Sequence, residues 1–337
     1  MSSPAVLVVG PSWVGDMVMA QSLFKWLAQS ESRPDIDVVA PAWSLPVLDR
    51  MPEVRRGVAL PLGHGALGLG VRRRIGHSLR DAGYTQAIVL PRSAKAALVP
   101  WFAKIPQRTG FRGEMRFGLI NDMRAFDRER LDQTVKRFLA LGLPEDAALP
   151  APPRPELRVD DAARDAAAAR LGLDLSRPAI GLLPGAEYGP AKCWPHAHFA
   201  RLARLLVEAG YAVWLFGGPG DQAAAATISA QAEVPVADLT GKTSLTEAID
   251  LLSLCGTVVT NDSGLMHVAA AVGCHTVALY GSTSPAFTPP LTDKQTIHDL
   301  ELSCSPCFAR ECPLKHLDCL WQITPEAVLA SVEAARA

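Results

Sequence analysis

The segment most suggestive of chemistry is residues 258–267, where a strand-like run passes directly into a helix-like run. The apolar, β-branched pattern breaks at Asn261-Asp262-Ser263-Gly264 and resumes with helical spacing. Unpaired N–H groups at such a helix start attract anions, and Ser263 and His267 would lie beside them. Because Asp262 is itself an anion, its carboxylate suits hydroxyl groups instead. These residues predict a ligand with phosphate and sugar hydroxyl groups, and a plain N-cap at Asp262 or Ser263 is the alternative.

A long loop rich in glycine and proline, residues 183–195, is a second candidate. It follows a predicted strand, and loops of this kind often carry functional residues. Lys192 precedes the next helix, where its ammonium group could offset the charge that builds up on a departing phosphate; otherwise it is a solvated surface lysine. The turn at residues 217–221 would let the backbone approach a nucleotide and Asp221 bind a ribose hydroxyl, unless its glycines serve only the turn.

Asp16 is the candidate for proton transfer. Gly10 and Gly15 have the spacing of a phosphate-binding loop, but Asp16-Met17 stand where Lys and Ser or Thr would be needed. A dinucleotide-binding fold would end its second strand with an acidic residue, and residues 40–42 contain none. A carboxylate at a helix start could instead accept a proton from a substrate hydroxyl. The alternative is that Asp16 only caps the helix and interacts with its dipole.

Strand and helix patterns alternate along both halves of the chain. Apolar runs at residues 5–9, 36–40, 57–60 and 86–90, and again at 179–183, 212–216, 235–238, 257–260 and 276–280, predict strands with helices between them. Residues 144–160 contain five prolines and no apolar periodicity, which predicts a linker. The expected α/β fold has two Rossmann-like, doubly wound parallel-sheet domains, residues 1–155 and 156–337, with ligands in the cleft between them. The last helix, near residues 325–335, is expected to pack back on the first domain.

Composition predicts a soluble chain of about two domains. The 337 residues are 49% hydrophobic, and no apolar run approaches the ~18 residues that a spanning helix needs. The start of the chain lacks the basic region of an export signal, so a cytoplasmic location is expected. Residues 1–150 contain 20 Lys and Arg against 14 Asp and Glu, whereas the remainder contains 13 against 20. The basic first half could face a polyanion or an anionic membrane, or merely present solvated arginines.

Three motifs together closely resemble those of the ADP-heptose:lipopolysaccharide heptosyltransferases, over most of the chain. They are Gly10-Pro11-Ser12-Trp13-Val14-Gly15-Asp16-Met17, Pro184-Gly185-Ala186-Glu187 with Lys192-x-Trp194-Pro195, and Asn261-Asp262-Ser263-Gly264-Leu265-Met266-His267. Two further segments resemble the heptosyltransferase II branch rather than branch I. These are Pro61-Leu62-Gly63-His64-Gly65-Ala66-Leu67 and Arg108-Thr109-Gly110-Phe111-Arg112-Gly113-Glu114-Met115-Arg116.

The resemblance implies the GT-B fold, with the donor bound mainly by the second Rossmann-like domain. It also implies a metal-independent, inverting transfer of L-glycero-D-manno-heptose from ADP-heptose to the first heptose of the lipopolysaccharide inner core. One carboxylate is enough for such a transfer, because the acceptor hydroxyl attacks directly and ADP leaves as a stable anion. The implied partners are ADP-heptose and heptosyl-Kdo-lipid A at the cytoplasmic face of the inner membrane, where the protein would be peripheral, and no nucleic acid.

Site residues carry over from the resemblance by position. Asp16 would be the base that deprotonates the acceptor hydroxyl, and Lys192 would stabilise the departing ADP phosphates. The remaining donor-binding residues in the matching motifs would be Gly185, Asp262, Ser263, Gly264 and His267. Asp221 and Thr243 are added from their places in the loops at residues 217–221 and 241–243, not from the resemblance. Among these, Thr243 is expected near adenine and Asp262 on the heptose hydroxyls. Arg108, Arg112 and Arg116 would contact acceptor phosphates and carboxylates, although arginine-rich loops also solvate themselves.

Four of the seven cysteines are clustered at Cys304-x2-Cys307-x4-Cys312-x6-Cys319. In a cytoplasmic protein such spacing indicates a structural Zn²⁺ site more readily than disulfides, and free thiols or an adventitious disulfide are the alternatives. No cofactor is expected for catalysis. Two other functions are open: another GT-B nucleotide-sugar enzyme, either a different transferase or an epimerase, and a non-catalytic two-domain binding protein.

Overall fold

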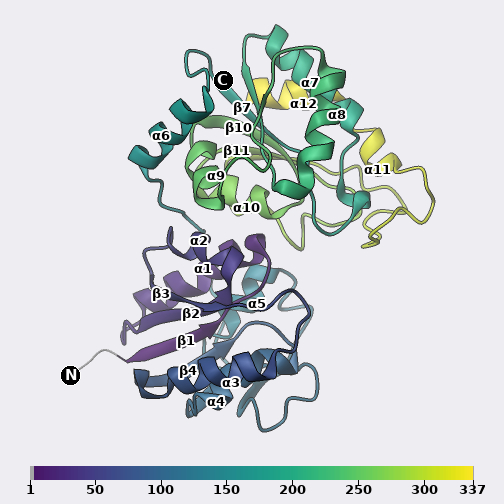
Figure 1. Cartoon of the computed structure of the whole chain (residues 1–337). Coiled ribbons are helices and arrows are strands. Elements are labelled where there is room, and N and C mark those ends of the chain that lie inside the picture. The colour runs from purple at the N-terminus through teal and green to yellow at the C-terminus, as the bar shows by residue number, and fades with distance from the viewer. Residues whose placement is uncertain (1–3, 337) are drawn as a thin grey trace. The chain divides into compact units, whose positions relative to one another are not determined.

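The computed structural model describes residues 4–336, and its internal contacts divide the chain into two units, Met1–Pro155 (unit 1) and Glu156–Ala337 (unit 2). The proline-rich segment is tied down on each side of this boundary. In unit 1 the Ser22 hydroxyl donates to the Pro153 carbonyl at 2.6 Å. In unit 2 the Leu157 N–H donates to the Ala271 carbonyl at 3.0 Å. Each unit is an α/β structure with its own sheet (Figure 1).

Unit 1 is built on a six-stranded parallel sheet in the order β3-β2-β1-β4-β5-β6. The central strand β1 is apolar and buried along its whole length, as expected for a parallel sheet covered on both faces. The order is that of a doubly wound fold, in which ligands bind at the carboxyl edge of the strands. The strands are β1 (Ala5–Val9), β2 (Asp35–Pro41), β3 (Val54–Leu60), β4 (Tyr84–Val89), β5 (Gln107–Phe111) and β6 (Asp122–Arg124).

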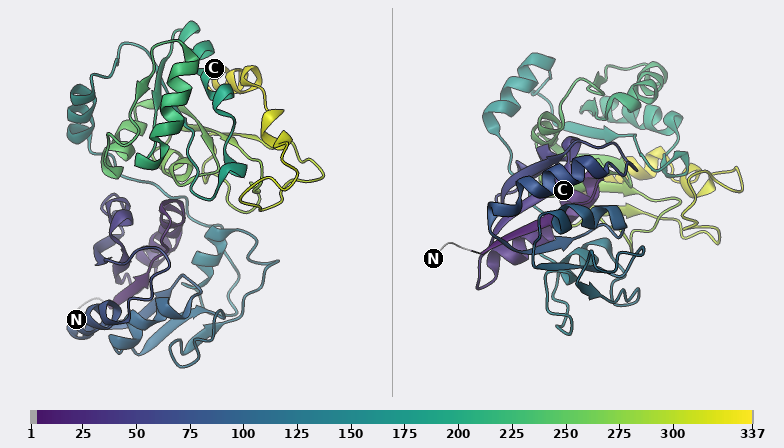
Figure 2. Two further views of the ribbon diagram at one scale, coloured as in Figure 1. Left: turned by 45° about the vertical axis from the view of Figure 1, so that its right-hand side comes forward. Right: turned by 60° about the horizontal axis from the view of Figure 1, so that its bottom comes forward.

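Helices cover both faces of the unit 1 sheet (Figures 1 and 2). On one face α1 packs against α2 and α5, and on the other α3 packs against α4. The α-helices are α1 (Val14–Gln29), α2 (Leu45–Leu48), α3 (Leu69–Ser78), α4 (Leu98–Phe102) and α5 (Thr134–Ala140). Short 3₁₀ turns lie at η1 (Ala42–Ser44), η2 (Arg80–Ala82) and η3 (Ala94–Ala97).

Unit 2 repeats this plan with a parallel sheet in the order β12-β11-β10-β7-β8-β9. Its strands are β7 (Ala179–Leu183), β8 (Ala212–Leu215), β9 (Ala237–Asp238), β10 (Cys255–Asn261), β11 (His275–Leu279) and β12 (Gln295–His298). Its helices are α6 (Asp161–Leu171), α7 (His196–Glu208), α8 (Gln222–Ala232), α9 (Leu245–Leu252), α10 (Gly264–Ala271), α11 (Asp318–Trp321) and α12 (Pro325–Ala334), with 3₁₀ turns η4 (Pro190–Lys192) and η5 (Pro219–Asp221).

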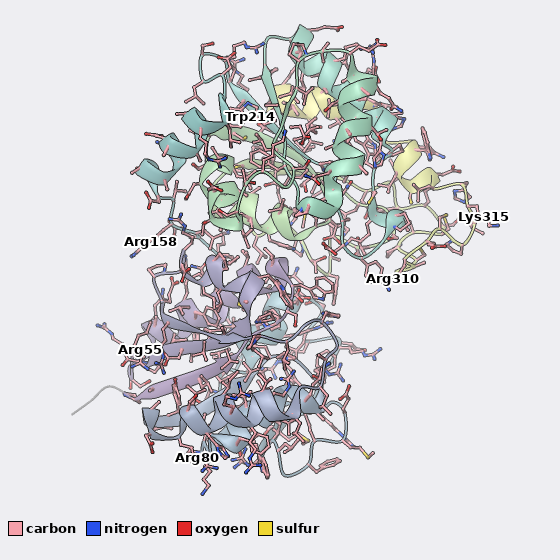
Figure 3. All side chains as sticks on the ribbon, viewed as in Figure 1. Arg55, Arg80, Arg158, Trp214, Arg310 and Lys315 are labelled. Carbon is pink, nitrogen blue, oxygen red and sulfur yellow. The ribbon has the colours of Figure 1, made fainter. Side chains whose placement is uncertain are left out.

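The final helix, α12, belongs to the core of unit 2. The predicted amphipathic face of α7 is buried, and α12 packs directly on α7 and β11. Val328 and Val332 of α12 are buried in the same cluster as Phe199 and Leu202 of α7. Its buried face is thus covered within unit 2, and the expectation that this helix also packs back on the first domain stays a prediction. Trp214 of β8 also lies inside this unit (Figure 3).

Two strands of unit 1 lie where the sequence suggested only an arginine- and glycine-rich loop. β5 pairs with β4 and β6 pairs with β5, so the sheet continues through this segment. The residues of β5 include Arg108 and Gly110, which hide the alternation of a strand. The Thr109 side chain links β5 to both neighbouring strands. Its hydroxyl accepts from Gln86 of β4 at 2.9 Å and donates to Asp122 of β6 at 2.8 Å.

A membrane-crossing helix needs about 20 predominantly apolar residues. Within residues 4–336 no helix combines the length and the apolar character needed to cross a membrane. The longest helix described, α1, has 16 residues and carries Asp16 and Lys25.

Candidate functional site

The turn between β10 and α10 has the geometry of an anion-binding helix start. β10 ends at Asn261 and α10 begins at Gly264, so two residues connect them. Ser263 occupies the N-cap position, but its side chain makes no capping hydrogen bond. The positive end of the helix dipole is thus not quenched by the cap, which suits a bound anion. The alternative that Asp262 or Ser263 acts as an ordinary side-chain cap disagrees with this geometry.

Asp262 is held in a buried ion pair instead. Its Oδ2 lies 2.6 Å from Lys192 Nζ, and the two side chains are only 7% and 13% exposed. The Thr283 hydroxyl donates to the same oxygen at 2.7 Å. The pair brings a strand-end carboxylate and the predicted phosphate-binding lysine together, two residues before α10 begins. A positive charge that could bind a diphosphate therefore lies beside an acceptor for hydroxyl groups.

Asn261 connects the lysine loop to the end of β10. Its amide nitrogen donates to the Pro184 carbonyl at 2.6 Å, and its Oδ1 accepts from the Trp194 N–H at 2.9 Å. Trp194 is fully buried and donates through its indole nitrogen to Ile323 at 3.0 Å. Both ends of the loop that carries Lys192 are fixed by these bonds. The sequence alone does not predict this role for Asn261, and the one signal for it is a polar residue at the end of an apolar strand.

His267 lies one turn into α10, facing the ion pair. It is 5% exposed, and burial lowers its pKa to about 4, with Lys192 lowering it further and Asp262 opposing the shift. Its Nδ1 atom is buried without a hydrogen-bond partner in the described structure. The imidazole is therefore neutral at pH 7, so it carries one N–H donor and no charge.

Because of this pKa, His267 should make stability fall in acid. Its folded pKa of about 4 lies below the reference value of 6.5, so between these values the unfolded chain binds more protons. The stability that the neutral ring contributes is intact above pH 6.5 and is lost progressively as the pH falls toward 4. The loss amounts to about 2 kcal/mol at pH 5. Urea unfolding at pH 7.5, 6 and 5 should show wild type losing more stability than His267→Gln. If the free energy of unfolding fell with pH equally in both proteins, His267 would not have the lowered pKa.

The β8 turn brings two other predicted donor residues together. Asp221 Oδ2 accepts from the Gly218 N–H at 2.8 Å. A Cβ atom on Gly185 would lie 2.4 Å from Asp221 Oδ1, so only glycine allows this approach of the lysine loop to the carboxylate. Thr243 is half-buried in the loop after β9. That loop meets the β8 turn through a hydrogen bond of 3.0 Å from the Gly241 N–H to the Gly217 carbonyl.

In unit 1, Asp16 lies in the first turn of α1 at the carboxyl edge of β1. Trp13, not Asp16, occupies the N-cap position, and Asp16 is partly exposed. Three aromatic side chains lie at the turn: the Trp43 indole donates to the Ser12 carbonyl at 2.9 Å, and the Trp13 and His64 rings lie 4.9 Å apart. Asp16 is therefore a carboxylate in the first turn of the helix, with aromatic side chains beside the turn that precedes it.

The three predicted acceptor arginines have different environments. Arg116 is fully buried and donates to the carbonyls of Pro91 and Phe111. Arg108 is half-buried and donates to the Leu119 carbonyl at 2.7 Å, among other backbone oxygens. Both guanidinium groups hold the loop after β5 in place through these bonds, and their expected role as acceptor contacts stays a prediction. Only Arg112 is exposed.

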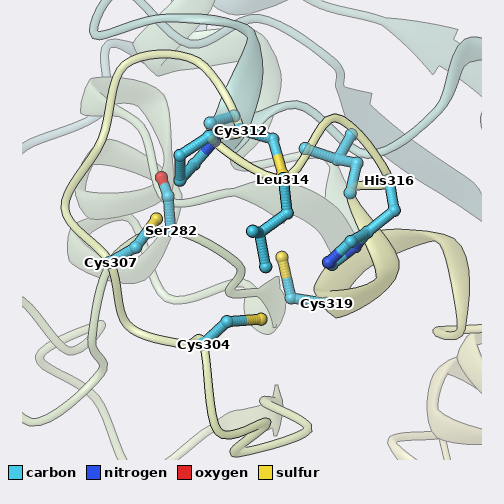
Figure 4. A pocket seen from close by; sticks show the side chains of 10 residues that line it. Ser282, Cys304, Cys307, Cys312, Leu314, His316 and Cys319 are labelled. Atoms are coloured by element: carbon cyan, nitrogen blue, oxygen red, sulfur yellow. The ribbon is translucent and has the colours of Figure 1, made fainter.

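The four clustered cysteines surround a small cavity together with Ser282 and His316 (Figure 4). All are free thiols, and burial raises the pKa of Cys319 to about 11. Within residues 4–336 no three His, Cys, Asp or Glu side chains are arranged to hold a metal ion. The arrangement therefore gives the predicted zinc site no support.

The cysteine-bearing loop instead packs on the lysine loop. The Tyr188 hydroxyl donates to the Phe308 carbonyl at 2.8 Å, and Arg310 Nε donates to the Tyr188 carbonyl at 2.8 Å. The Ala191 N–H donates to the Arg310 carbonyl at 3.1 Å. The side chains of Arg310 and Lys315 lie on the outside of unit 2 (Figure 3). These contacts add a further support to the segment that positions Lys192.

Known glycosyltransferases resemble this chain in sequence and in structure. The model of glycosyltransferase family 9 (heptosyltransferase) matches residues 72–318. Lipopolysaccharide heptosyltransferase 2 of Escherichia coli strain K12 is 46% identical over 98% of this chain and 97% of its own. Lipooligosaccharide heptosyltransferase 2 of Haemophilus influenzae is 48% identical over 87% of each chain. The solved structure of E. coli ADP-heptose lipopolysaccharide heptosyltransferase II superposes with a TM-score of 0.88, at 43% identity and 98% coverage of both chains.

The family match covers well over half of the chain, and the E. coli relative aligns over nearly its full length. The α/β fold with two Rossmann-like parallel-sheet domains, expected from the sequence, is confirmed by the structure and by the superposition, and each sheet has six strands. The chain therefore belongs to glycosyltransferase family 9, the heptosyltransferases, and is a glycosyltransferase of the GT-B fold.

Proposed function

We propose that this protein transfers L-glycero-D-manno-heptose from ADP-heptose to the first heptose of the lipopolysaccharide inner core. Membership of family 9 and the near full-length likeness to proteins named heptosyltransferase 2 support this substrate pair. The observation that carries the proposal is the Lys192–Asp262 pair beside the start of α10. A cation, a helix start and a hydroxyl acceptor in one place match a sugar diphosphate, which offers two phosphates and several hydroxyl groups.

The donor would bind to unit 2 with its diphosphate between Lys192 and the α10 start. The first N–H groups of the helix would donate to phosphate oxygens, and the hydroxyl of Ser263 and the neutral ring of His267 would add two donors. Lys192 would then be shared between phosphate and Asp262, which would accept from heptose hydroxyls. As the bond to the sugar breaks, negative charge grows on the phosphate, and the ammonium group stabilises it.

Asp16 would activate the acceptor. The acceptor hydroxyl oxygen bonds to the anomeric carbon on the face opposite ADP, and the bond from that carbon to the β-phosphate oxygen breaks. The electron pair leaves with ADP, and the hydroxyl proton moves to the Asp16 carboxylate. One displacement of this kind inverts the anomeric configuration. The proposed steps use no metal ion.

The acceptor would be heptosyl-Kdo-lipid A, and the protein would work as a peripheral protein at the cytoplasmic face of the inner membrane. The exposed guanidinium of Arg112 is suited to the acceptor's phosphates or carboxylates. Arg108 and Arg116 would act only through the loop that they hold.

Substitutions at Arg112 and Arg116 should have different effects, so each variant serves as a control for the other. Arg112→Ala should raise the KM for the acceptor about tenfold with an unchanged melting temperature, because it removes one charge-assisted contact. Arg116→Met should instead cost about 2–3 kcal/mol of stability, since it leaves two buried carbonyls without their donor. Steady-state kinetics and thermal unfolding of both variants distinguish the roles. A stable Arg116→Met protein with a specific acceptor defect would contradict this division.

The direct test is ADP release from ADP-heptose in the presence of defined acceptors. We expect turnover with an acceptor that ends in the first heptose, and little with Kdo-lipid A that lacks it. Kdo-lipid A as the better acceptor would reject the proposed acceptor. Turnover of a UDP- or GDP-sugar in place of ADP-heptose would favour a different nucleotide-sugar enzyme. Tight ADP-heptose binding without turnover on any acceptor would favour a binding protein.

A further inference from the structure

The loop after β5, residues 112–119, exposes two large apolar side chains. Met115 is 90% exposed and Phe117 is 70% exposed, the two highest values among the large hydrophobic residues within positions 4–336. They flank Arg116, which is fully buried. The usual arrangement is thus reversed, with the charged residue inside and its apolar neighbours outside. Apolar side chains grouped on a surface in this way indicate a binding partner more often than isolated ones do.

The loop is held in this form by contacts at its base. Arg116 Nη1 donates to the Pro91 carbonyl at 2.8 Å. Glu114 donates through its backbone N–H to Arg92 and accepts from the Ala94 N–H at 2.8 Å. A Cβ atom on Gly113 would lie 2.3 Å from the Arg92 carbonyl oxygen, so the loop backbone lies directly on that segment. The exposure of Met115 and Phe117 therefore comes from a fixed loop shape.

Positive charge lies beside this apolar tip. Arg92 and Arg112 are exposed, and the single acid within residues 92–117, Glu114, has its carboxylate engaged with the backbone of η3. Arg92 stacks on the Phe126 ring at 4.4 Å, and Arg112 is exposed beside the tip. Apolar residues within a basic surround are complementary to an anionic lipid surface, where the side chains enter the interface and the cations meet headgroups.

The loop also lies at the functional edge of unit 1. β5 and β1 run parallel in one sheet, separated by β4, so their carboxyl ends share an edge. The loop begins directly after β5, and Asp16 follows β1 at that same edge. A membrane contact there would bring the bilayer to the side of the unit from which the proposed base acts.

We propose that Met115 and Phe117 insert into the interfacial region of an anionic lipid bilayer, with Arg112 and its basic neighbours on the headgroups. The inference deepens the proposed function, because it names the surface by which the enzyme would reach a membrane-embedded acceptor. A second copy of this chain would also cover apolar side chains, but the basic surround would then repel itself across the contact.

Vesicle co-sedimentation without donor or acceptor tests the surface. The wild-type protein should bind vesicles containing phosphatidylglycerol and bind phosphatidylcholine vesicles weakly. Met115→Ser with Phe117→Ser should reduce binding about tenfold or more, because two interfacial anchors are lost. Leu175→Ser is the matched control, since Leu175 is 57% exposed on a loop of unit 2. It should bind like wild type, and all proteins should share one melting temperature.

Equal binding by the double variant, or no binding by wild type, would overturn the proposal. So would a change from dimer to monomer in sedimentation velocity caused by the double substitution, because the covering partner would then be a second copy. Turnover separates this surface from the reaction. The double variant should keep wild-type turnover on a soluble, deacylated acceptor and lose it on acceptor embedded in vesicles. A wild-type protein that binds vesicles but transfers no heptose would refute the proposed function alone.

Discussion

Replacing Asp16 by Asn is expected to lower kcat by about 10³-fold, within the range that general-base catalysis supplies. The amide is nearly the same size but cannot take the acceptor proton, so the loss should fall on the chemical step. Affinity for ADP-heptose should be unchanged, because the donor is assigned to unit 2. Titration calorimetry for the donor and ADP release for turnover measure the two quantities separately.

Two further variants control for this result. Asp81→Asn removes an exposed carboxylate from the η2 turn of the same unit and should behave like wild type. Asp16→Glu keeps a carboxylate but displaces it, so it should recover part of the rate lost in the Asn variant. Turnover by Asp16→Asn within a few-fold of wild type would exclude Asp16 as the base.

The second large effect is expected at Lys192. Lys192→Ala should weaken ADP binding about 10–100-fold and lower kcat by about 10²-fold, because the ammonium group acts on the charge of both bound and departing ADP. The substitution also leaves Asp262 buried without its cation, so its carboxylate would then repel the diphosphate.

A double-variant cycle separates these contributions. Asp262→Asn in the Lys192→Ala background removes the repulsion and should restore part of the ADP affinity, but not the rate. Lys136→Ala is the control, because Lys136 forms an exposed ion pair with Asp132 at 2.8 Å and should have no effect on ADP. Unchanged ADP affinity and rate in Lys192→Ala would remove Lys192 from the donor site.

Most of the fold could be predicted because most of its strands and helices have a regular pattern of apolar residues. Buried parallel strands such as β1 and β10 are short, β-branched, apolar runs, and α7 shows helical spacing that its burial confirms. The strands that were missed, β5 and β6, are polar and are held by pairing with the sheet. The packing of α12 on α7 and β11 could not be predicted, because periodicity along one helix does not tell which surface its apolar face meets.

Within the site, residue type and position at strand ends were enough to nominate Lys192, Asp262 and His267. The structure adds contacts between distant segments, which no local pattern reports. Thr283 binds Asp262 across 21 residues, and Asn261 binds Pro184 across 77. The same limit explains Arg116. A run of arginines in an exposed-looking loop predicts a binding surface, and only the folded chain reveals that this side chain points inward to hold the loop.

Binding of the donor diphosphate at the start of α10 underlies every step proposed for this enzyme. A crystal structure of the protein with ADP measures it without intermediate assumptions. We expect phosphate oxygens within hydrogen-bonding distance of Lys192 Nζ and of the first backbone N–H groups of α10, with His267 beside them. A diphosphate bound elsewhere on the chain, with Lys192 still fully paired to Asp262, would contradict it.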